Sequence, residues 1–203
     1  MAELIKTAIL SVSNKSGLAE FARHLAQMGV RLYATCGTLR ALEEVEIRAI
    51  PVGELTQFPE MMDGCIKTLH PAVFAGILAR RGHKKDMDTL AAHQMEPIDM
   101  VVVNLRAFRM PDNQESNLSA EQLHDMDIGG VALLRAAAKN YRHVAPIVNP
   151  VDYEAIIEEM LAKDRQLGEA TRLRLATQAI ERCLEYDRQI LDFLKNSATP
   201  PKD

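Results

Sequence analysis

The segment "KTLHP", residues 67–71, places a cation, a hydroxyl and an imidazole directly before a proline. Lys67 has the charge to stabilise a developing oxyanion, and Thr68 has the hydroxyl to hydrogen-bond a ligand carbonyl. The other interpretation is a solvated polar turn that leads into the apolar run "AVFAGILA". These residues by themselves leave both interpretations open.

Two further polar clusters follow predicted strands and precede predicted helices. "SVSNKSG" lacks the glycine spacing of a Walker loop, but its hydroxyls, its lysine and the free helix amides together suit a phosphate. The alternative is an ordinary N-cap formed by Ser13, Asn14 or Ser16. "ATCGT" presents the same choice, because Gly37 permits close approach of the backbone and Thr38 is either a cap or an oxyanion donor.

The fourth cluster combines "NLRAF", which ends the most apolar predicted strand, with "DMDIGG". Asp127 precedes a glycine pair that is unfavourable inside a helix, which indicates that amides there approach an anion or a carbonyl. Lys139 lies roughly 15 Å further along the same helix axis, so no direct pair with Asp127 is expected. Ligands bind beyond the carboxyl ends of parallel strands, and the four clusters together therefore predict a site for a phosphorylated small molecule.

The segments between the clusters alternate between strand-like and helix-like patterns. Strands are predicted over 7–13, 30–35, 47–55, 97–105 and 144–149, and helices over 17–29, 38–45, 82–95, 129–140, 150–162 and 168–195, the last interrupted once. Residues 72–79 fit either type, and 109–125 form a polar loop with a short helix. The alternation predicts an α/β fold, a three-layer parallel-sheet domain with extra C-terminal helices. The last helix exceeds what such a domain needs, so we expect it to pack across the domain or against a second subunit.

Composition and length restrict the class of protein. The 203 residues suit a single domain, predicted over 1–196 with a disordered tail over 197–203. A net charge of -4 argues against nonspecific binding of nucleic acid. Three widely spaced cysteines indicate reduced thiols, and no Cys-x-x-Cys or His-x-x-x-His spacing suggests a structural metal. Since no segment resembles a signal peptide or a membrane span, we expect a cytoplasmic protein without a membrane partner.

Several blocks, in order along nearly the whole chain, resemble the IMP cyclohydrolase domain of the bifunctional AICAR transformylase/IMP cyclohydrolase enzymes of purine biosynthesis. The blocks are "ILSVSNKSGLAEFARHLAQMGVRLYATCGT", "FPEMMDGCIKTLHPAVFAGILARR", "IDMVVVNLRAF", "DIGGVALLRAAAKN", "VNPVDY" and "TRLRLATQAIERCLEYDRQILDFL". The chain ends where the larger transformylase domain would begin, so it resembles a stand-alone cyclohydrolase.

The resemblance implies a methylglyoxal-synthase-like fold, a homodimer, and no metal or cofactor. It implies that the chain closes the purine ring of a phosphorylated imidazole ribotide, formyl-AICAR, to give IMP and water, with formyl-AICAR supplied by a separate AICAR transformylase. The implied catalytic residues are Lys67, Asp127 and Lys139, with Asp127 as the proton-transfer group. The implied substrate-binding residues are Ser11, Ser13, Lys15, Ser16, Gly37, Thr38, Thr68, Asn104, Ile128 and Gly129.

The chain also departs from the family pattern. Cys65 stands where arginine is common, and Arg106-Ala107 replaces Tyr-Pro. Ala34 and Cys36 replace a serine and a glycine of the phosphate turn, and Phe74-Ala75 replaces His-Gly. Our hypothesis is that Arg106 binds substrate and restores the guanidinium that position 65 lacks.

Two other functions fit the same residues. One is a nucleotide-binding regulatory or scaffold protein that retains the phosphate site but has lost turnover, an interpretation favoured by the substitutions at Cys65 and Arg106. The other is an enzyme of the same fold that acts on a triose phosphate, as methylglyoxal synthase does. The blocks "KTLHP" and "RAAAKN" argue against the triose phosphate enzyme.

Overall fold

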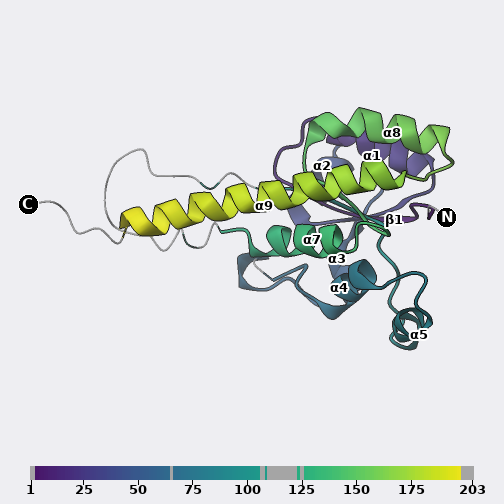
Figure 1. Ribbon diagram of the computed structural model, residues 1–203, viewed down its shortest axis with the longest axis horizontal. Coiled ribbons are helices and arrows are strands. Elements are labelled where there is room, and N and C mark those ends of the chain that lie inside the picture. Colours follow the sequence, from purple (N-terminus) through teal and green to yellow (C-terminus); the bar gives the residue numbers. More distant parts are fainter. Residues whose placement is uncertain (1–2, 65, 106–107, 109–122, 124–125, 198–203) are drawn as a thin grey trace, which may run out of the picture.

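Parallel strands form the centre of the computed structural model, which describes residues 3–64, 66–105, 108, 123 and 126–197 (Figure 1). Five strands lie in the order β3-β2-β1-β4-β5. They are β1 (Thr7–Val12), β2 (Arg31–Ala34), β3 (Ile50–Pro51), β4 (Met100–Asn104) and β5 (Ala145–Ile147). In the central strand, Ile9 pairs with Tyr33 of β2 and with Val101 of β4. Because all pairs are parallel, the carboxyl ends of the strands meet at one edge of the sheet.

Helices cover both faces of the sheet, which explains the continuous apolar runs of β1 and β4. One face packs against α1 (Leu18–Gln27), α2 (Cys36–Glu43) and α8 (Tyr153–Ala162). The other packs against α3 (Val52–Thr56), α4 (Pro71–Leu78), α7 (Ile128–Lys139) and α9 (Glu169–Ser197). Helix α5 (Lys84–Ala92) lies at the periphery, and η1 (Met62–Gly64) and η2 (Pro150–Asp152) are short 3-10 turns (Figure 1). The predicted three-layer α/β fold with C-terminal helices is confirmed.

The third strand is shorter than the predicted range 47–55. Only Ile50 and Pro51 pair with β2, and α3 begins at Val52. Proline has no backbone N–H, so it is tolerated at a sheet edge but weakens the ladder there.

The undecided run at 72–79 is helical and forms most of α4. Pro71 occupies the first turn, where its missing N–H is not needed for an intrahelical bond. His70 is the N-cap, and its Nδ1 accepts a hydrogen bond from the backbone N–H of Ala72 at 3.2 Å. The imidazole that stands beside Lys67 in the sequence therefore helps to start α4.

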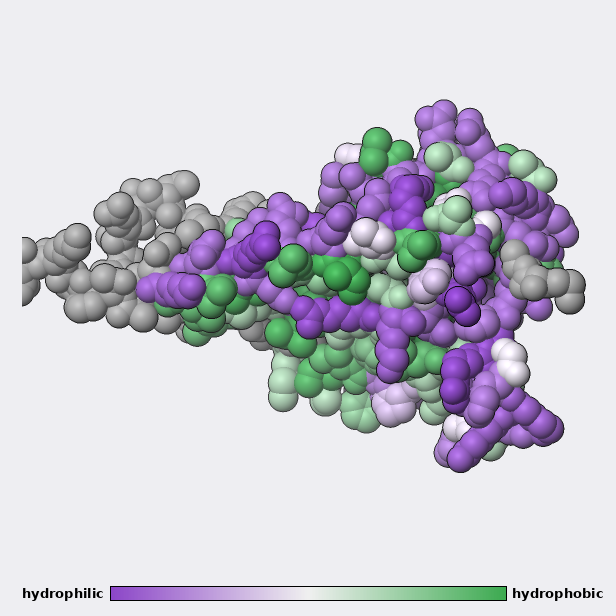
Figure 2. All heavy atoms as spheres, in the orientation of Figure 1, coloured by the Kyte–Doolittle hydropathy of each residue, from purple (hydrophilic) through white to green (hydrophobic). Residues whose placement is uncertain are grey.

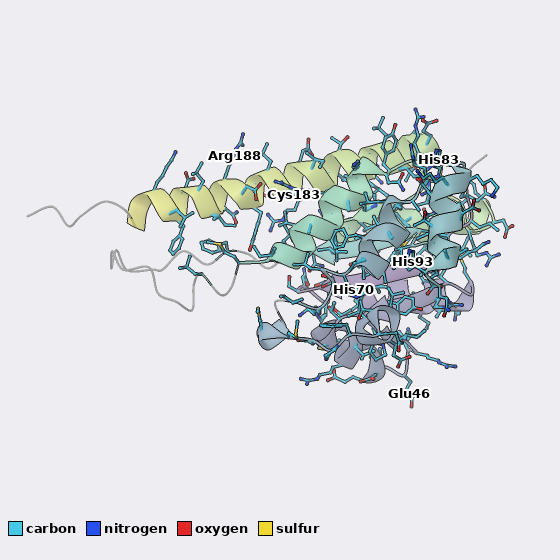
Figure 3. The ribbon with its side chains drawn as sticks, turned by 90° about the horizontal axis from the view of Figure 1, so that it is seen from below. Glu46, His70, His83, His93, Cys183 and Arg188 are labelled. Atoms are coloured by element: carbon cyan, nitrogen blue, oxygen red, sulfur yellow. The ribbon has the colours of Figure 1, made fainter. Side chains whose placement is uncertain are left out.

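Helix α9 has 29 residues without the predicted interruption. Its buried side chains include Ala179, Cys183 and Tyr186, and its C-terminal part runs well past the end of α7 (Figure 1). Cys183 points toward α7, whereas Arg188 points away from the domain (Figure 3). No helix in the described ranges is long and apolar enough to cross a membrane. The predicted loop over 109–125 and the predicted tail fall almost entirely outside the described residues.

Candidate functional site

The four polar clusters lie around the carboxyl edge of the sheet, as the parallel topology requires. Asn104 ends β4 and holds the loop that follows β1. The backbone N–H groups of Ser13 and Asn14 donate to Asn104 Oδ1 at 2.6 and 2.8 Å, and Asn104 Nδ2 donates to the carbonyl of Asn14 at 3.1 Å. The Ser13 hydroxyl also donates to Asn104 Oδ1 at 3.0 Å. Asn104 therefore determines the shape of this loop.

The loop after β1 is not an ordinary capping sequence. The N-cap of α1 is Gly17, with a φ of 68°, and no side chain among the described residues caps this end of the helix. The Asn14 side chain instead accepts the N–H of Ser16 at 2.9 Å, and Lys15 Nζ donates to the carbonyl of Val12. The loop folds on itself and leaves its serine hydroxyls at an exposed surface.

Thr38 connects this loop to α2. Its buried hydroxyl accepts the N–H of Val12 at 3.0 Å and donates to the carbonyl of the same residue at 3.3 Å. The N-cap of α2 is Thr35, whose hydroxyl donates to Ser11 Oγ at 3.0 Å. A Cβ built at Gly37 would meet no atom of the described residues within 4 Å. Among the described residues, the first turn of α2 therefore has open space beside Gly37. Hydrogen bonds hold the neighbouring side chains of Ser11 and Thr38 in place.

Glu60 links Cys36 to Lys67 across this opening. The Cys36 thiol donates to Glu60 Oε2 at 2.6 Å, and Lys67 Nζ lies 4.0 Å from Glu60 Oε1. The hydrogen bond to Glu60, partial burial and the negative charge of Glu60 raise the pKa of the Cys36 thiol, while Lys67 opposes the shift. Gly64 has a φ of 87°, which residues with a side chain rarely adopt, and a Cβ there would displace the end of the Glu60 side chain, since it would lie 2.3 Å from Glu60 Oε1.

Thr68 faces the first turn of α7. It is 3% exposed, and a Cβ built at Gly129 would lie only 2.8 Å from Thr68 Oγ1. The close neighbour of Gly129 is thus a hydroxyl of the same chain. The approach of an anion or a carbonyl to the amides of this glycine pair stays a prediction. This contact brings "KTLHP" and "DIGG", which are some 60 residues apart in the sequence, to one place.

Asp127 is held at two points. Its Oδ1 accepts the N–H of Gly130 at 2.6 Å and so caps α7, and its own backbone N–H donates to the hydroxyl of Tyr186 at 2.7 Å. Tyr186 is fully buried on α9. Among the described residues no hydrogen bond engages Asp127 Oδ2, so this oxygen is an acceptor that a ligand proton can use. Ile128, the next residue, is 59% exposed at the same helix end.

A cavity of about 600 Å³ opens between this edge of the sheet and α9. Ser13, Asn104 and Leu105 line one side of it. Polar side chains of α9 line the other side: Gln178, Glu181, Arg182 and Glu185. The sequence-based prediction did not include these α9 residues or Glu60 and Tyr186. They stand in blocks that carry the family resemblance, but no local spacing marked them as site residues.

Lys139 is not brought to this site within one chain. It is the last residue of α7, about 17 Å along the axis from the helix start. It lines a different cavity of about 520 Å³, together with Arg80, His83, Tyr141 and Arg142. Arg106 and Cys65 lie outside the described residues. In the described ranges no three His, Cys, Asp or Glu side chains are grouped so that they could hold a metal ion.

The chain is similar to known families and proteins over most of its length. The model described as "MGS-like domain" matches residues 17–132, and the model described as "AICARFT/IMPCHase bienzyme" matches residues 137–202. The Bifunctional purine biosynthesis protein PurH of Staphylococcus epidermidis is 47% identical over 193 residues, which are 95% of this chain and 39% of that protein. PurH of Chloroflexus aurantiacus is 44% identical over 98% of this chain and 38% of that protein.

A solved structure has nearly the same extent as this chain. "Crystal structure of ForH" superimposes with a TM-score of 0.83 and 31% identity, and the match covers 93% of this chain and 98% of that one. The chain thus spans less than half of the PurH proteins but almost all of ForH. One family model covers more than half of its residues, and this chain belongs to the MGS-like domain family.

Proposed function

We propose that the chain is an IMP cyclohydrolase of purine biosynthesis, which closes the ring of formyl-AICAR to give IMP and water. The observation that carries the proposal is the contact between Thr68 and the first turn of α7, beside Asp127. It puts a hydroxyl, a helix N-terminus and a carboxylate within one site, which are the groups that ring closure requires. The similarity to the PurH proteins supports the same reaction.

The phosphate of the ribotide would bind at the first turn of α2 and the loop after β1. The open space before Gly37 gives a phosphate access to the α2 amides, and helix N-termini favour anions. Ser11, Ser13, Lys15 and Ser16 would add hydroxyls and a positive charge, while Thr38 and Asn104 hold the loop in shape. A bound phosphate would compete with Glu60 for Lys67 and for the space next to Cys36.

In the proposed reaction, the carboxamide nitrogen attacks the formyl carbon and forms the new C–N bond. Lys67 and Thr68 stabilise the negative charge that develops on the formyl oxygen. Asp127 Oδ2 accepts the proton that leaves the carboxamide nitrogen. The C–O bond then breaks, and the oxygen departs as water with that proton and the proton of the formamido nitrogen. This leaves the C=N bond of the ring, and no redox partner is needed.

The proposal extends to partners. It includes a separate AICAR transformylase that supplies formyl-AICAR, and a homodimer in the cytoplasm. Lys139 and Arg106 remain predictions of substrate contact, because the first lies apart in one chain and the second outside the described residues.

The test is to supply formyl-AICAR to the purified protein and to follow IMP formation. We expect turnover above the uncatalysed closure, and a loss of two or more orders of magnitude in kcat for Lys67→Ala and for Asp127→Asn. Asparagine is as good an N-cap as aspartate, so Asp127→Asn retains the start of α7 and removes only the base. Lys84→Ala, at an exposed lysine that pairs with Asp88, is the matched control. Unchanged rates in both site variants would refute the assignment.

The regulatory alternative has one observation in its favour. Glu60 pairs with Lys67 in the described structure and partly neutralises the cation that the reaction needs. A protein that binds IMP tightly but forms none from formyl-AICAR would support this alternative. Production of methylglyoxal from dihydroxyacetone phosphate would instead support the triose phosphate activity.

A further inference from the structure

Five basic side chains line the cavity of about 520 Å³ at the ends of α4 and α7. They are Arg80, His83, Lys139, Arg142 and His143, and no carboxylate of the described residues lines the same cavity. This is the reverse of the chain as a whole, which has a net charge of -4. We call this space the basic cavity. Hydrophilic side chains also gather over the neighbouring helix α5 (Figure 2).

The walls of the basic cavity are joined to each other by the fold. One wall is the segment 80–83, which follows α4, and the other is the segment 139–143 at the end of α7. Asn140 is buried, and its Nδ2 donates to the carbonyls of Ile77 at 2.7 Å and of Ala79 at 3.1 Å. Because these bonds already fix the two walls, a ligand would order little of the chain when it binds.

Two cations of the basic cavity are available to a ligand. Among the described residues no side-chain hydrogen bond or ion pair engages Lys139. Arg142 Nε lies 3.7 Å from Glu169 Oε1, and the two side chains are 72% and 71% exposed, so this pair contributes little and exchanges readily. A hydrogen bond with Tyr141 raises the pKa of the Arg142 guanidinium, which therefore stays charged. Arg80, in contrast, is held by the carboxylate of Asp86, which accepts hydrogen bonds from it at 2.8 and 3.0 Å.

The position of the basic cavity at two helix ends disfavours an anion, but by less than the cations favour it. The carboxyl ends of α4 and α7 each carry a partial charge of about -0.5. Lys139 and Arg142 each carry a full positive charge, and together they exceed the two partial charges. Asn140 also donates to two of the carbonyls at the end of α4, which lowers the negative potential there. The balance therefore favours a negatively charged ligand.

The charges and the size of the basic cavity suit a phosphorylated small molecule. Lysine and arginine bind phosphate oxygens through charge-assisted hydrogen bonds, and the imidazoles of His83 and His143 can add further donors. A volume of about 520 Å³ is that of a pocket for a whole small molecule rather than for a phosphate ion alone. A nucleic acid requires an extended basic surface, whereas here the cations line a cavity in an acidic chain.

We propose that the basic cavity binds a phosphorylated small molecule and holds its phosphate between Lys139 and Arg142. The cavity is separate from the candidate site, because α4 and α7 each begin beside the candidate site and end at the basic cavity. Figure 3 shows His83, which lines the basic cavity, well away from His70, which caps the start of α4. The inference does not depend on the proposed reaction, and it gives Lys139 a ligand contact within one chain.

NMR of the histidine rings in the full chain tests the site, with the six histidines assigned by single substitutions to glutamine. We expect inorganic phosphate, exchanged for chloride at constant ionic strength, to move the ring signals of His83 and His143 in a saturable way. Lys139→Gln and Arg142→Gln should each raise the dissociation constant at least about tenfold, since each removes a charge-assisted hydrogen bond. The matched control, Arg188→Gln on α9, should leave it unchanged, because Arg188 points away from the domain (Figure 3). Absent shifts of His83 and His143, or an unchanged constant in both cavity variants, overturn the proposal.

The same ring signals identify the class of ligand. Ribose 5-phosphate and AMP should bind more tightly than inorganic phosphate, because they fill more of the cavity. Equal affinity for all three, which means a site for a free phosphate ion only, overturns the small-molecule ligand, and so does a DNA oligonucleotide that binds more tightly than AMP. His70 lies beside the candidate site, so its ring signal follows phosphate there in the same samples. A shift of His70 without shifts of His83 and His143 refutes this inference and leaves the proposed function unaffected.

Discussion

Replacing Gly129 with alanine tests the contact at the centre of the candidate site. A Cβ at this position would lie 2.8 Å from Thr68 Oγ1, whereas ordinary van der Waals contact begins at 3.4 Å. Thr68 or the first turn of α7 must therefore move by about 0.6 Å, the difference between these two distances. Because Thr68 is buried, it cannot avoid the new methyl group by turning into solvent.

The expected loss of activity follows from the size of this displacement. A displacement of 1 Å at reacting groups costs about a hundredfold in rate, so about 0.6 Å predicts a loss of roughly tenfold in kcat/KM. Tenfold corresponds to about 1.4 kcal/mol of transition-state stabilisation. Alanine also favours a helix over glycine by about 1 kcal/mol, which offsets part of the steric strain. We therefore expect the free energy of unfolding to change by no more than about 1 kcal/mol while activity falls.

The assay combines IMP formation from formyl-AICAR with thermal unfolding of the same samples. Gly82→Ala is the control, because a Cβ there would meet no atom within 4 Å in the part of the chain that the structure describes, and the residue lies outside the site. It should leave both quantities unchanged. If Gly129→Ala retains the wild-type kcat/KM at equal stability, Thr68 and the α7 turn do not act together on the substrate.

Two further predictions concern single contacts of the site. Tyr186→Phe removes the acceptor of the partly buried Asp127 N–H, so we expect stability lower by about 1 kcal/mol and a lower kcat. The control is Tyr33→Phe, whose hydroxyl bonds Glu96 elsewhere, and an unchanged kcat in Tyr186→Phe would show that Tyr186 does not position Asp127. Glu60→Gln should lower the raised pKa of the Cys36 thiol, so that iodoacetamide modifies Cys36 faster at neutral pH, as followed by peptide mass. Equal rates in the two proteins would argue against the contact between Cys36 and Glu60.

The fold class was predictable because it depends on short-range patterns. The continuous apolar run of β4 and the alternation of strands and helices require a covered parallel sheet whatever the details. The prediction of a strand over 47–55 was wrong outside Ile50 and Pro51. Pro51 weakens the hydrogen-bond ladder of the sheet, and α3 begins at Val52. The sequence did not decide between strand and helix for the run at 72–79, because a short apolar segment fits both. In the structure it is a helix that begins with Pro71 and is capped by His70.

The candidate site, like the fold, was predictable only in part. The sequence by itself determined which residues reach the carboxyl edge of the sheet, because strand ends and helix starts can be located along the chain. It did not determine how they meet: that Thr68 contacts Gly129, that Glu60 lies between Cys36 and Lys67, or that Tyr186 holds Asp127. The helix spacing did separate Lys139 from Asp127, but only the structure shows that Lys139 lines a different cavity. These relations join segments distant in the sequence, and only the packing of α4, α7 and α9 on one face of the sheet decides their distances.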